Sequence, residues 1–105
     1  MRMLLTATIP NESGNAAVKN GTLGSTIQKI LGDLKPESAY FIASPSGERC
    51  ALIVFDMKES SELPMVAEPW FLAFGSRISV QPAMTPQDLA AAEPGFARAI
   101  KEFAK

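Results

Sequence analysis

Apolar and polar residues alternate along the chain in two segments, residues 2–9 and 76–82. A period of two is typical of a β-strand with one buried face. Residues 38–43 and 49–57 are apolar and rich in β-formers, and the turn residues Ser44 to Glu48 lie between them. Such a sequence favours a hairpin. The pattern therefore predicts four strands, the middle two of which form a hairpin.

A helical period runs through residues 15–34, where one face carries Leu23, Ile27, Ile30, Leu31 and Leu34. Asn11 or Ser13 is expected to cap this helix. The Asn20-Gly21-Thr22 stretch predicts a bend or a restart, because glycine weakens a helix interior. The helix is expected to end at Lys35-Pro36, since the residue before a proline avoids the α conformation.

A second helical stripe consists of Leu63, Val66, Ala67, Trp70, Phe71 and Phe74. Ser60 or Ser61 is the expected cap of this helix. Pro69 is expected to kink the helix or to start a second short one, because proline removes a donor from the helix interior. Gly75 is placed to end it.

A C-terminal helix is predicted after Thr85-Pro86, where threonine serves as cap and proline takes the first helical position. Pro94-Gly95 interrupts this segment. The last piece carries an apolar stripe formed by Phe96, Ile100 and Phe103.

The order of elements is β-α-β-β-α-β with a helical tail, which is the split βαβ arrangement. The predicted fold is α+β: a four-stranded antiparallel sheet of the ferredoxin-like kind, with both helices on one face. A chain of 105 residues has material for one core, so residues 1–105 are expected to form one domain. Residues 1–84 form its core and residues 85–105 its tail.

The second face of this sheet needs a cover, because it mixes apolar and polar side chains. Its predicted members are Leu4, Thr6, Thr8, Tyr40, Ile42, Leu52, Val54, Arg77, Ser79 and Gln81. The middle is too apolar to face water, and the rim is too polar for a core within one chain. A second copy laid against the same patch satisfies both facts, so we expect a homodimer.

Composition and charge exclude several classes of function. Ten basic and eleven acidic residues give a net charge of −1 without a basic run, so nucleic-acid binding is not expected. Histidine is absent and Cys50 is the only cysteine. We therefore expect no metal, no haem or other cofactor, and no nucleophile–histidine catalysis. The apolar run at the N-terminus ends at Thr6, and no stretch is long enough to span a membrane, which favours a cytoplasmic protein without membrane contact.

Two stretches carry a family resemblance: Met3-Leu4-Leu5-Thr6-Ala7-Thr8-Ile9-Pro10 and the stretch from Trp70 to Met84, which closes as Val80-Gln81-Pro82-Ala83-Met84. The chain resembles the dimeric α/β-barrel superfamily, and within it is similar to a group of small bacterial proteins of unknown function. The resemblance implies a sheet-to-sheet dimer. Activities in the superfamily that need haem or a His–Asp pair do not carry over, because this chain lacks the histidine.

Eight residues are the ligand-pocket candidates: Arg77, Ser79, Gln81, Tyr40, Trp70, Phe71, Thr6 and Thr8. Each also has a structural interpretation, which for Trp70 and Phe71 is core packing on the helical stripe and for Tyr40 is a place in the dimer interface. A dimer would enclose Arg77, which then needs an anion.

A protein carboxylate such as Asp56 or Glu68 is the expected partner of Arg77, and a ligand anion is the alternative. Asp56 itself ends an apolar strand, where its pKa is either raised or that of an ordinary exposed acid. Cys50 is expected to be an inert small hydrophobe.

The first functional hypothesis is a homodimeric binding or structural module that holds a small apolar or aromatic ligand, or none, in each sheet–helix cavity. The resemblance implies an alternative, a cofactor-independent monooxygenase that uses Trp70, Tyr40 and Arg77. A third hypothesis is a protein-interaction adaptor that uses the tail from Phe96 to Phe103. An enzyme requires Arg77 and Tyr40 to converge on a cavity, whereas an adaptor requires an uncovered tail.

Overall fold

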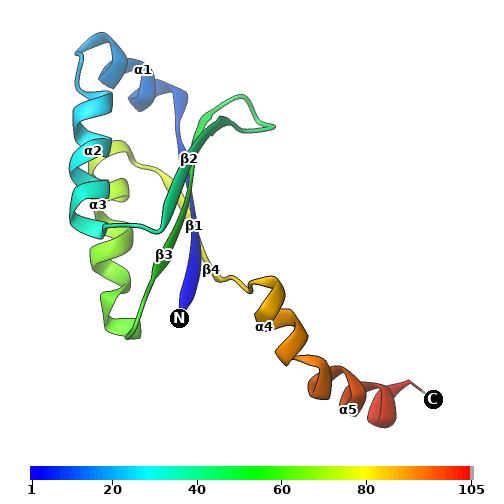
Figure 1. Ribbon diagram of the computed structural model, residues 1–105. Helices are drawn as coiled ribbons and strands as arrows, with labels where there is room; N and C mark the ends of the chain where they lie inside the picture. The colour runs from blue at the N-terminus through cyan, green and yellow to red at the C-terminus, as the bar shows by residue number, and fades with distance from the viewer. Residues whose placement is uncertain (105) are drawn as a thin grey trace.

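A computed structural model describes residues 1–104 and contains a four-stranded antiparallel sheet in the order β2-β3-β1-β4 (Figure 1). The strands are β1 (Arg2–Ile9), β2 (Ser38–Ala43), β3 (Arg49–Asp56) and β4 (Arg77–Pro82). The central strand β1 alternates in burial along its length, as predicted, and its central neighbour β3 alternates from Ala51 to Asp56. The α+β, ferredoxin-like βαββαβ prediction is confirmed, including the hairpin at residues 44–48, where the Ser44 amide donates to the Glu48 carbonyl at 2.7 Å.

Three helices cover the same face of the sheet (Figure 1): α1 (Asn11–Lys19), α2 (Leu23–Leu34) and α3 (Leu63–Phe74). The predicted restart separates α1 from α2, and Gly21 in the turn has a positive φ of 72°. The helix begins earlier than predicted, after Pro10, and no side chain caps it. The predicted caps Asn11 and Ser13 are therefore wrong. Ser13 lies within α1, where its hydroxyl donates to the Phe74 carbonyl at 2.6 Å and ties α1 to the end of α3.

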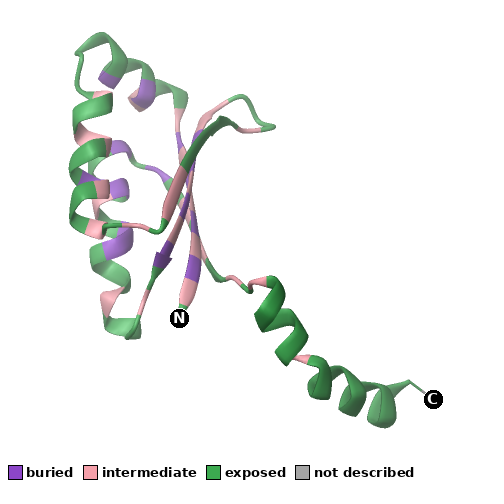
Figure 2. Cartoon of the chain, viewed as in Figure 1, coloured by how far each residue is buried: buried purple, intermediate pink, exposed green. Residues whose placement is uncertain are grey.

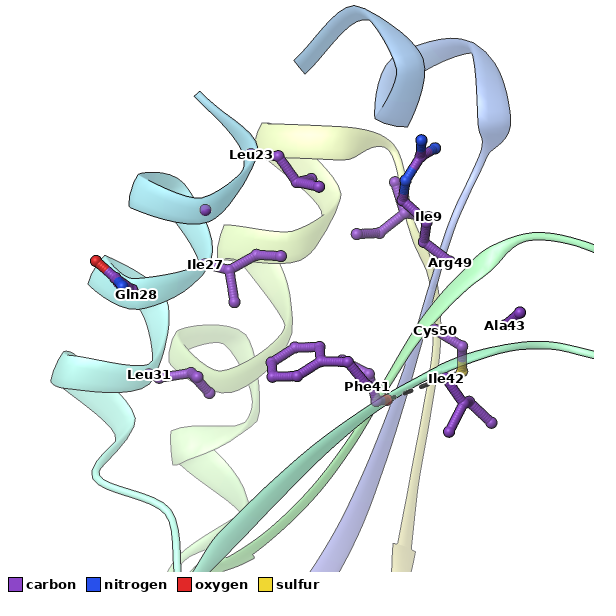
Figure 3. Close-up of a pocket in the computed structure, with 12 residues that line it drawn as sticks. Ile9, Leu23, Ile27, Gln28, Leu31, Phe41, Ile42, Ala43, Arg49 and Cys50 are labelled. Carbon is purple, nitrogen blue, oxygen red and sulfur yellow. Dashed lines mark hydrogen bonds between the residues drawn. The ribbon is translucent and has the colours of Figure 1, made fainter. Parts of the chain in front are cut away.

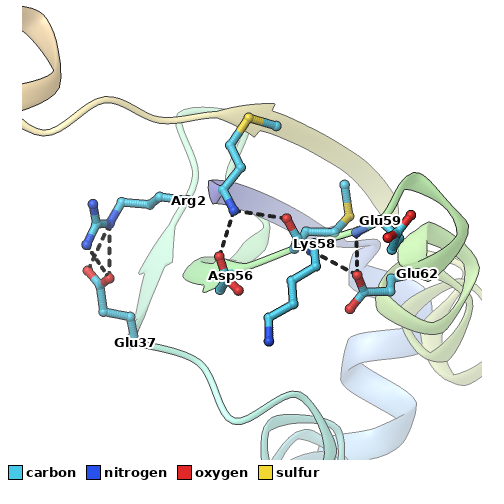
Figure 4. A network of polar contacts seen from close by, with 8 residues as sticks. Arg2, Glu37, Asp56, Lys58, Glu59 and Glu62 are labelled. Atoms are coloured by element: carbon cyan, nitrogen blue, oxygen red, sulfur yellow. Dashed lines mark hydrogen bonds and ion pairs between the residues drawn. The ribbon is translucent and has the colours of Figure 1, made fainter. Parts of the chain in front are cut away.

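The entry to α3 differs from the prediction. A short 3₁₀ turn, η1 (Ser60–Glu62), precedes the helix, and the reciprocal cap joins Glu59 and Glu62 instead of using Ser60 or Ser61. The Glu62 carboxylate accepts from the amides of Lys58 and Glu59 at 2.9 and 2.6 Å (Figure 4). The longer side chain of Glu62 reaches back to these N–H groups, whereas the short side chains of Ser60 and Ser61 are less suited to do so.

Helix α3 continues across Pro69, so the expected start of a second short helix is wrong. Buried residues lie on both sides of the proline, and their contacts with the sheet hold the helix together. Pro69 has no N–H to donate to the carbonyl of Met65. Met65 lies on the exposed side of α3. The predicted end at Gly75 is confirmed, with a φ of 61° that suits glycine.

The core lies between the sheet and α1–α3 (Figure 2). Its fully buried large side chains are Trp70, Phe55, Leu5, Ile9 and Ile53. All of the β1 and β3 members in this set point toward the helices, so the strand alternation decides which half of each strand is core.

The C-terminal tail, which consists of α4 (Pro86–Ala91) and α5 (Glu93–Phe103), projects from the body on the side of the sheet that faces away from α1–α3 (Figure 1). The Thr85 hydroxyl accepts from the Asp88 amide at 3.1 Å, which confirms the predicted cap. The interruption falls at Ala92, just before Pro94. The tail is almost entirely exposed (Figure 2) and extends the molecule to 58 Å.

Across residues 1–104, no helix has the length and the apolar character needed to cross a membrane.

Candidate functional site

An apolar hollow lies between α2 and the β2–β3 hairpin (Figure 3), and we call it the α2–β2 groove. Its volume is about 470 Å³. The apolar lining comes mainly from the side chains of Ile9, Leu23, Ile27, Leu31 and Phe41. Leu23, Ile27 and Leu31 follow one another at helical spacing, so a single face of α2 forms one wall.

Sheet register explains why space remains there. Phe41 on β2 pairs with Ala51 on β3, and Ala51 lies opposite Ala7 on β1. All three side chains face the helices, and the two alanines fill little of the space beside the ring. Phe41 therefore projects toward α2 (Figure 3) yet remains 55% exposed. The groove therefore exists because the small side chains of Ala7 and Ala51 lie next to the large ring of Phe41.

One cation lies at the α1 end of the groove. Arg49 Nη1 donates to Asn15 Oδ1 at 3.0 Å. Its guanidinium packs against Gly14, where an added Cβ would lie 2.8 Å from Nη1. Within residues 1–104, Arg49 forms no ion pair, and its hydrogen-bond partner Asn15 is a neutral amide. Gln28 also borders the groove but points away from it (Figure 3).

Six of the predicted pocket residues lie on the opposite side of the sheet, on the face that we call the open face. It comprises Leu4, Thr6, Thr8, Tyr40, Ile42, Cys50, Leu52, Val54, Arg77, Ser79 and Gln81. One row across this face reads Tyr40, Leu52, Thr6, Ser79. The predicted membership of this face is confirmed by the register.

Tyr40 and Arg77 do not converge within one chain. They belong to the two edge strands, β2 and β4, which are three strand spacings apart. That separation amounts to about 14 Å. The constellation that the monooxygenase hypothesis requires is therefore not assembled by this chain.

Arg77 pairs with Glu48, not with the predicted Asp56 or Glu68. Its Nη2 donates to Glu48 Oε1, and the Ser46 hydroxyl donates to the same carboxylate at 3.0 Å. The arginine, and next the serine, lower the pKa of Glu48 below its ordinary value. The carboxylate comes from the hairpin turn, whose folding over β1 the sequence alone does not reveal.

Asp56 accepts from the ammonium group of Met1 at 2.7 Å (Figure 4). This contact lowers the pKa of Asp56, so the hypothesis of a raised-pKa acid is wrong. Nearby, Arg2 and Glu37 form an ion pair with an N···O distance of 2.7 Å. The open face thus has an ion pair at each end: Arg2 with Glu37 at one and Arg77 with Glu48 at the other.

Trp70 lies inside the core on the helix side of the sheet and has no exposed surface. Its ring packs on Phe74 with a centroid distance of 6.2 Å, as the core-packing interpretation expects. Its Nε1 has no acceptor among the described residues. Phe71 is 42% exposed and borders a separate shallow hollow near Glu68. Neither residue lines the α2–β2 groove.

Cys50 is buried, as expected, and the Thr8 hydroxyl approaches its sulfur at 3.8 Å. In the part of the chain that the structure describes, no three cysteine or carboxylate side chains gather closely enough to hold a metal ion.

The residues that form the groove were missed as a site by sequence reasoning. Phe41 and Ile42 are adjacent in β2, so one of them must face each side of the sheet. A strand with apolar side chains on both faces indicates that both faces are covered or that one of them binds a ligand. This feature of β2 could have pointed to the groove. No pattern in the sequence indicates where the Arg49 side chain lies, because its position depends on how α1 packs against the hairpin.

The chain matches no protein-family model and no curated protein. Among solved structures it is similar to a formyltetrahydrofolate deformylase from Pseudomonas putida KT2440, with a TM-score of 0.50 and 16% sequence identity. The match covers 79% of this chain and 29% of the deformylase chain. A likeness at this identity supports the ferredoxin-like fold alone.

Proposed function

We propose that this chain is a small-molecule-binding module that works as a homodimer, with a small apolar or aromatic ligand in the α2–β2 groove of each copy. One observation carries the proposal: the groove is already formed in the free chain. Its volume of about 470 Å³ falls within the range of roughly 300–1,000 Å³ that is usual for ligand sites.

The lining defines the class of ligand. Leu23, Ile27, Leu31 and Phe41 offer apolar contact, and Phe41 adds an aromatic ring for stacking. Arg49 is the charged group at one end, and its five donors exceed the single bond that it makes to Asn15. A flat or branched hydrocarbon with a polar end suits this arrangement. Binding needs no covalent step, and the groove lining contains no nucleophile with a general base beside it.

The open face supports the homodimer. Tyr40 is 65% exposed, and Ile42 on the same strand is 45% exposed. Exposed apolar surface on a sheet is costly in water, whereas a two-fold interface covers it with an identical patch. The ion pairs at the ends of the face supply the polar rim that such interfaces have.

The adaptor hypothesis remains the second candidate function, because one observation favours it. Ile100 and Phe103 in the tail are 63% and 85% exposed. An adaptor requires an uncovered stripe of this kind. The two functions differ in where a variant loses binding: in the groove for a small molecule, and in the tail for a protein partner.

A pair of substitutions tests the groove with 2-naphthol as the probe. Phe41→Ala removes the ring that projects into the groove, and Tyr40→Ala removes the next ring on the same strand, which lies on the other face. We expect Phe41→Ala to weaken 2-naphthol binding about tenfold, which corresponds to about 1.4 kcal/mol, and Tyr40→Ala to leave it unchanged.

Isothermal titration calorimetry of the full chain measures this affinity, and chemical shifts of the groove residues locate the probe. Both rings are more than half exposed, so neither loss should unfold the domain. Equal effects of the two variants, or shifts confined to the tail, would contradict the groove as the site.

A further inference from the structure

The C-terminal tail presents apolar side chains that nothing in its own chain covers. Phe96 is 49% exposed, Ile100 63% and Phe103 85%, and the three share one face of α5. Arg98 lies on the opposite face of the helix. Helices of six and eleven residues are too short to be stable alone in water. A cover for the α5 stripe is therefore needed to hold the tail in the form that it takes.

The path of the chain directs the tail away from its own apolar edge. The tail follows β4, whereas the exposed apolar side chains Tyr40 and Ile42 are on β2, at the other edge of the sheet. The Ala83 amide donates to the Arg2 carbonyl at 3.0 Å, which holds the start of the tail against β1. From there the tail leaves on the open-face side (Figure 1). It heads toward the space that a second copy would occupy.

Interface area gives a reason for the tail to take part in the proposed dimer. Four strands of six to eight residues present a patch of roughly 400 Å² on the open face. Stable specific interfaces bury about 800 Å² per partner. The flat footprint of the sheet is small for an interface of this size. The apolar stripe of α5 is a large uncommitted surface on the same side of the molecule, and it can supply the rest.

We infer that the tail is exchanged in the dimer: the apolar face of α5 in each copy packs along the β2 edge of the other copy, at Tyr40 of the partner subunit. This inference rests on the face-to-face homodimer of the proposed function. A two-fold axis parallel to the strands places β4 of each copy opposite β2 of its partner. The helical residues of the tail extend about 25 Å, whereas stacked sheets are about 10 Å apart, so the tail reaches beyond the partner's sheet.

A substitution in the tail tests the exchange without touching the core. Ile100→Asp places a charge in the stripe, and Arg98→Asp introduces the same side chain on the opposite face of α5 as a matched control. Sedimentation of the full chain at micromolar concentrations measures the dimer dissociation constant. We expect Ile100→Asp to raise it at least tenfold and Arg98→Asp to leave it near the wild-type value.

The outcomes separate the two proposals. A wild-type chain that sediments as a monomer overturns the homodimer and the exchange together. A dimeric wild type with an unchanged dissociation constant for Ile100→Asp overturns the exchange alone. Binding of 2-naphthol is measured on the same samples, and it tests the groove independently of both.

Cross-linking shows which copy the tail contacts. A Phe103→Cys chain is mixed with a Tyr40→Cys chain and treated with a short bis-maleimide, while native Cys50 stays buried. A product that contains one chain of each variant supports the exchange. In the double variant, a link that closes within one chain shows that the tail folds back on its own subunit. A link within one chain would overturn the inference. The absence of any link, both in the mixture and in the double variant, would overturn it as well and would favour the adaptor hypothesis.

Discussion

Trp70 offers the sharpest test of how the helix layer packs on the sheet. The side chain is fully buried against Phe74, and it is the only tryptophan in the chain. Two opposing effects act on it. The indole fills core volume, which stabilises the fold, while its Nε1 is buried without an acceptor among residues 1–104, which costs about 1–3 kcal/mol.

Replacement by phenylalanine separates these effects. Trp70→Phe empties roughly 40 Å³, and at about 24 cal/mol per Å³ this costs about 1 kcal/mol. The same change removes the unpaired N–H, whose relief is of similar size and opposite sign. We expect Trp70→Phe to alter the free energy of unfolding by no more than about 1 kcal/mol. Trp70→Ala leaves a far larger cavity, so it should cost about 3–5 kcal/mol.

Urea unfolding of both variants measures these differences. Circular dichroism is the suitable signal, because either variant loses the only tryptophan fluorescence. For a domain with about 5–15 kcal/mol of stability, the alanine variant approaches the threshold of unfolding while the phenylalanine variant keeps its wild-type midpoint. A Trp70→Phe variant as unstable as Trp70→Ala would refute the reasoning, since it would mean that the indole N–H makes a bond that stabilises the core.

Three further predictions concern an ion pair and two glycines. Arg77 lowers the pKa of Glu48, so the contribution of this pair to stability is present above the ordinary carboxyl pKa of 4.5 and is lost as the pH falls through the lower folded value. The melting-temperature difference between wild type and Glu48→Gln should therefore shrink below about pH 4.5, and a constant difference would contradict the pairing. Gly75→Ala should cost about 1 kcal/mol because Gly75 ends α3 with a φ of 61°. Gly24→Ala should instead gain about 0.5–1 kcal/mol, because Gly24 is helical and its added Cβ meets nothing within 4 Å. Chemical denaturation measures both changes, and a loss at Gly24 would show that its position tolerates no side chain.

Local chemistry in the sequence was enough to locate most elements. Turn residues at Ser44–Glu48, the weak Asn20–Thr22 stretch, Gly75 and the Thr85 cap each act over a few neighbours, and each of these predictions is confirmed. Alternation along the strands likewise predicted which residues share the open face. The errors at Asn11 and Pro69 arose where tertiary contacts outweigh local preference, since the packing of α1 and α3 on the sheet decides where these helices begin and continue.

The candidate site could not be predicted from the local pattern of apolar and polar residues. Apolar spacing left Trp70 and Phe71 open to core packing or to a pocket. Only the assembled layers show that Trp70 is fully buried, that Phe71 is partly exposed away from the groove, and that Phe41 lines the groove instead. The partner of Arg77 was undecidable for the same reason, because Glu48 reaches it across β1 from the hairpin turn. Sequence determines the elements and their faces because those depend on neighbours along the chain. The tertiary structure decides the groove, the ion pairs and the direction of the tail, because those depend on residues that folding alone brings together.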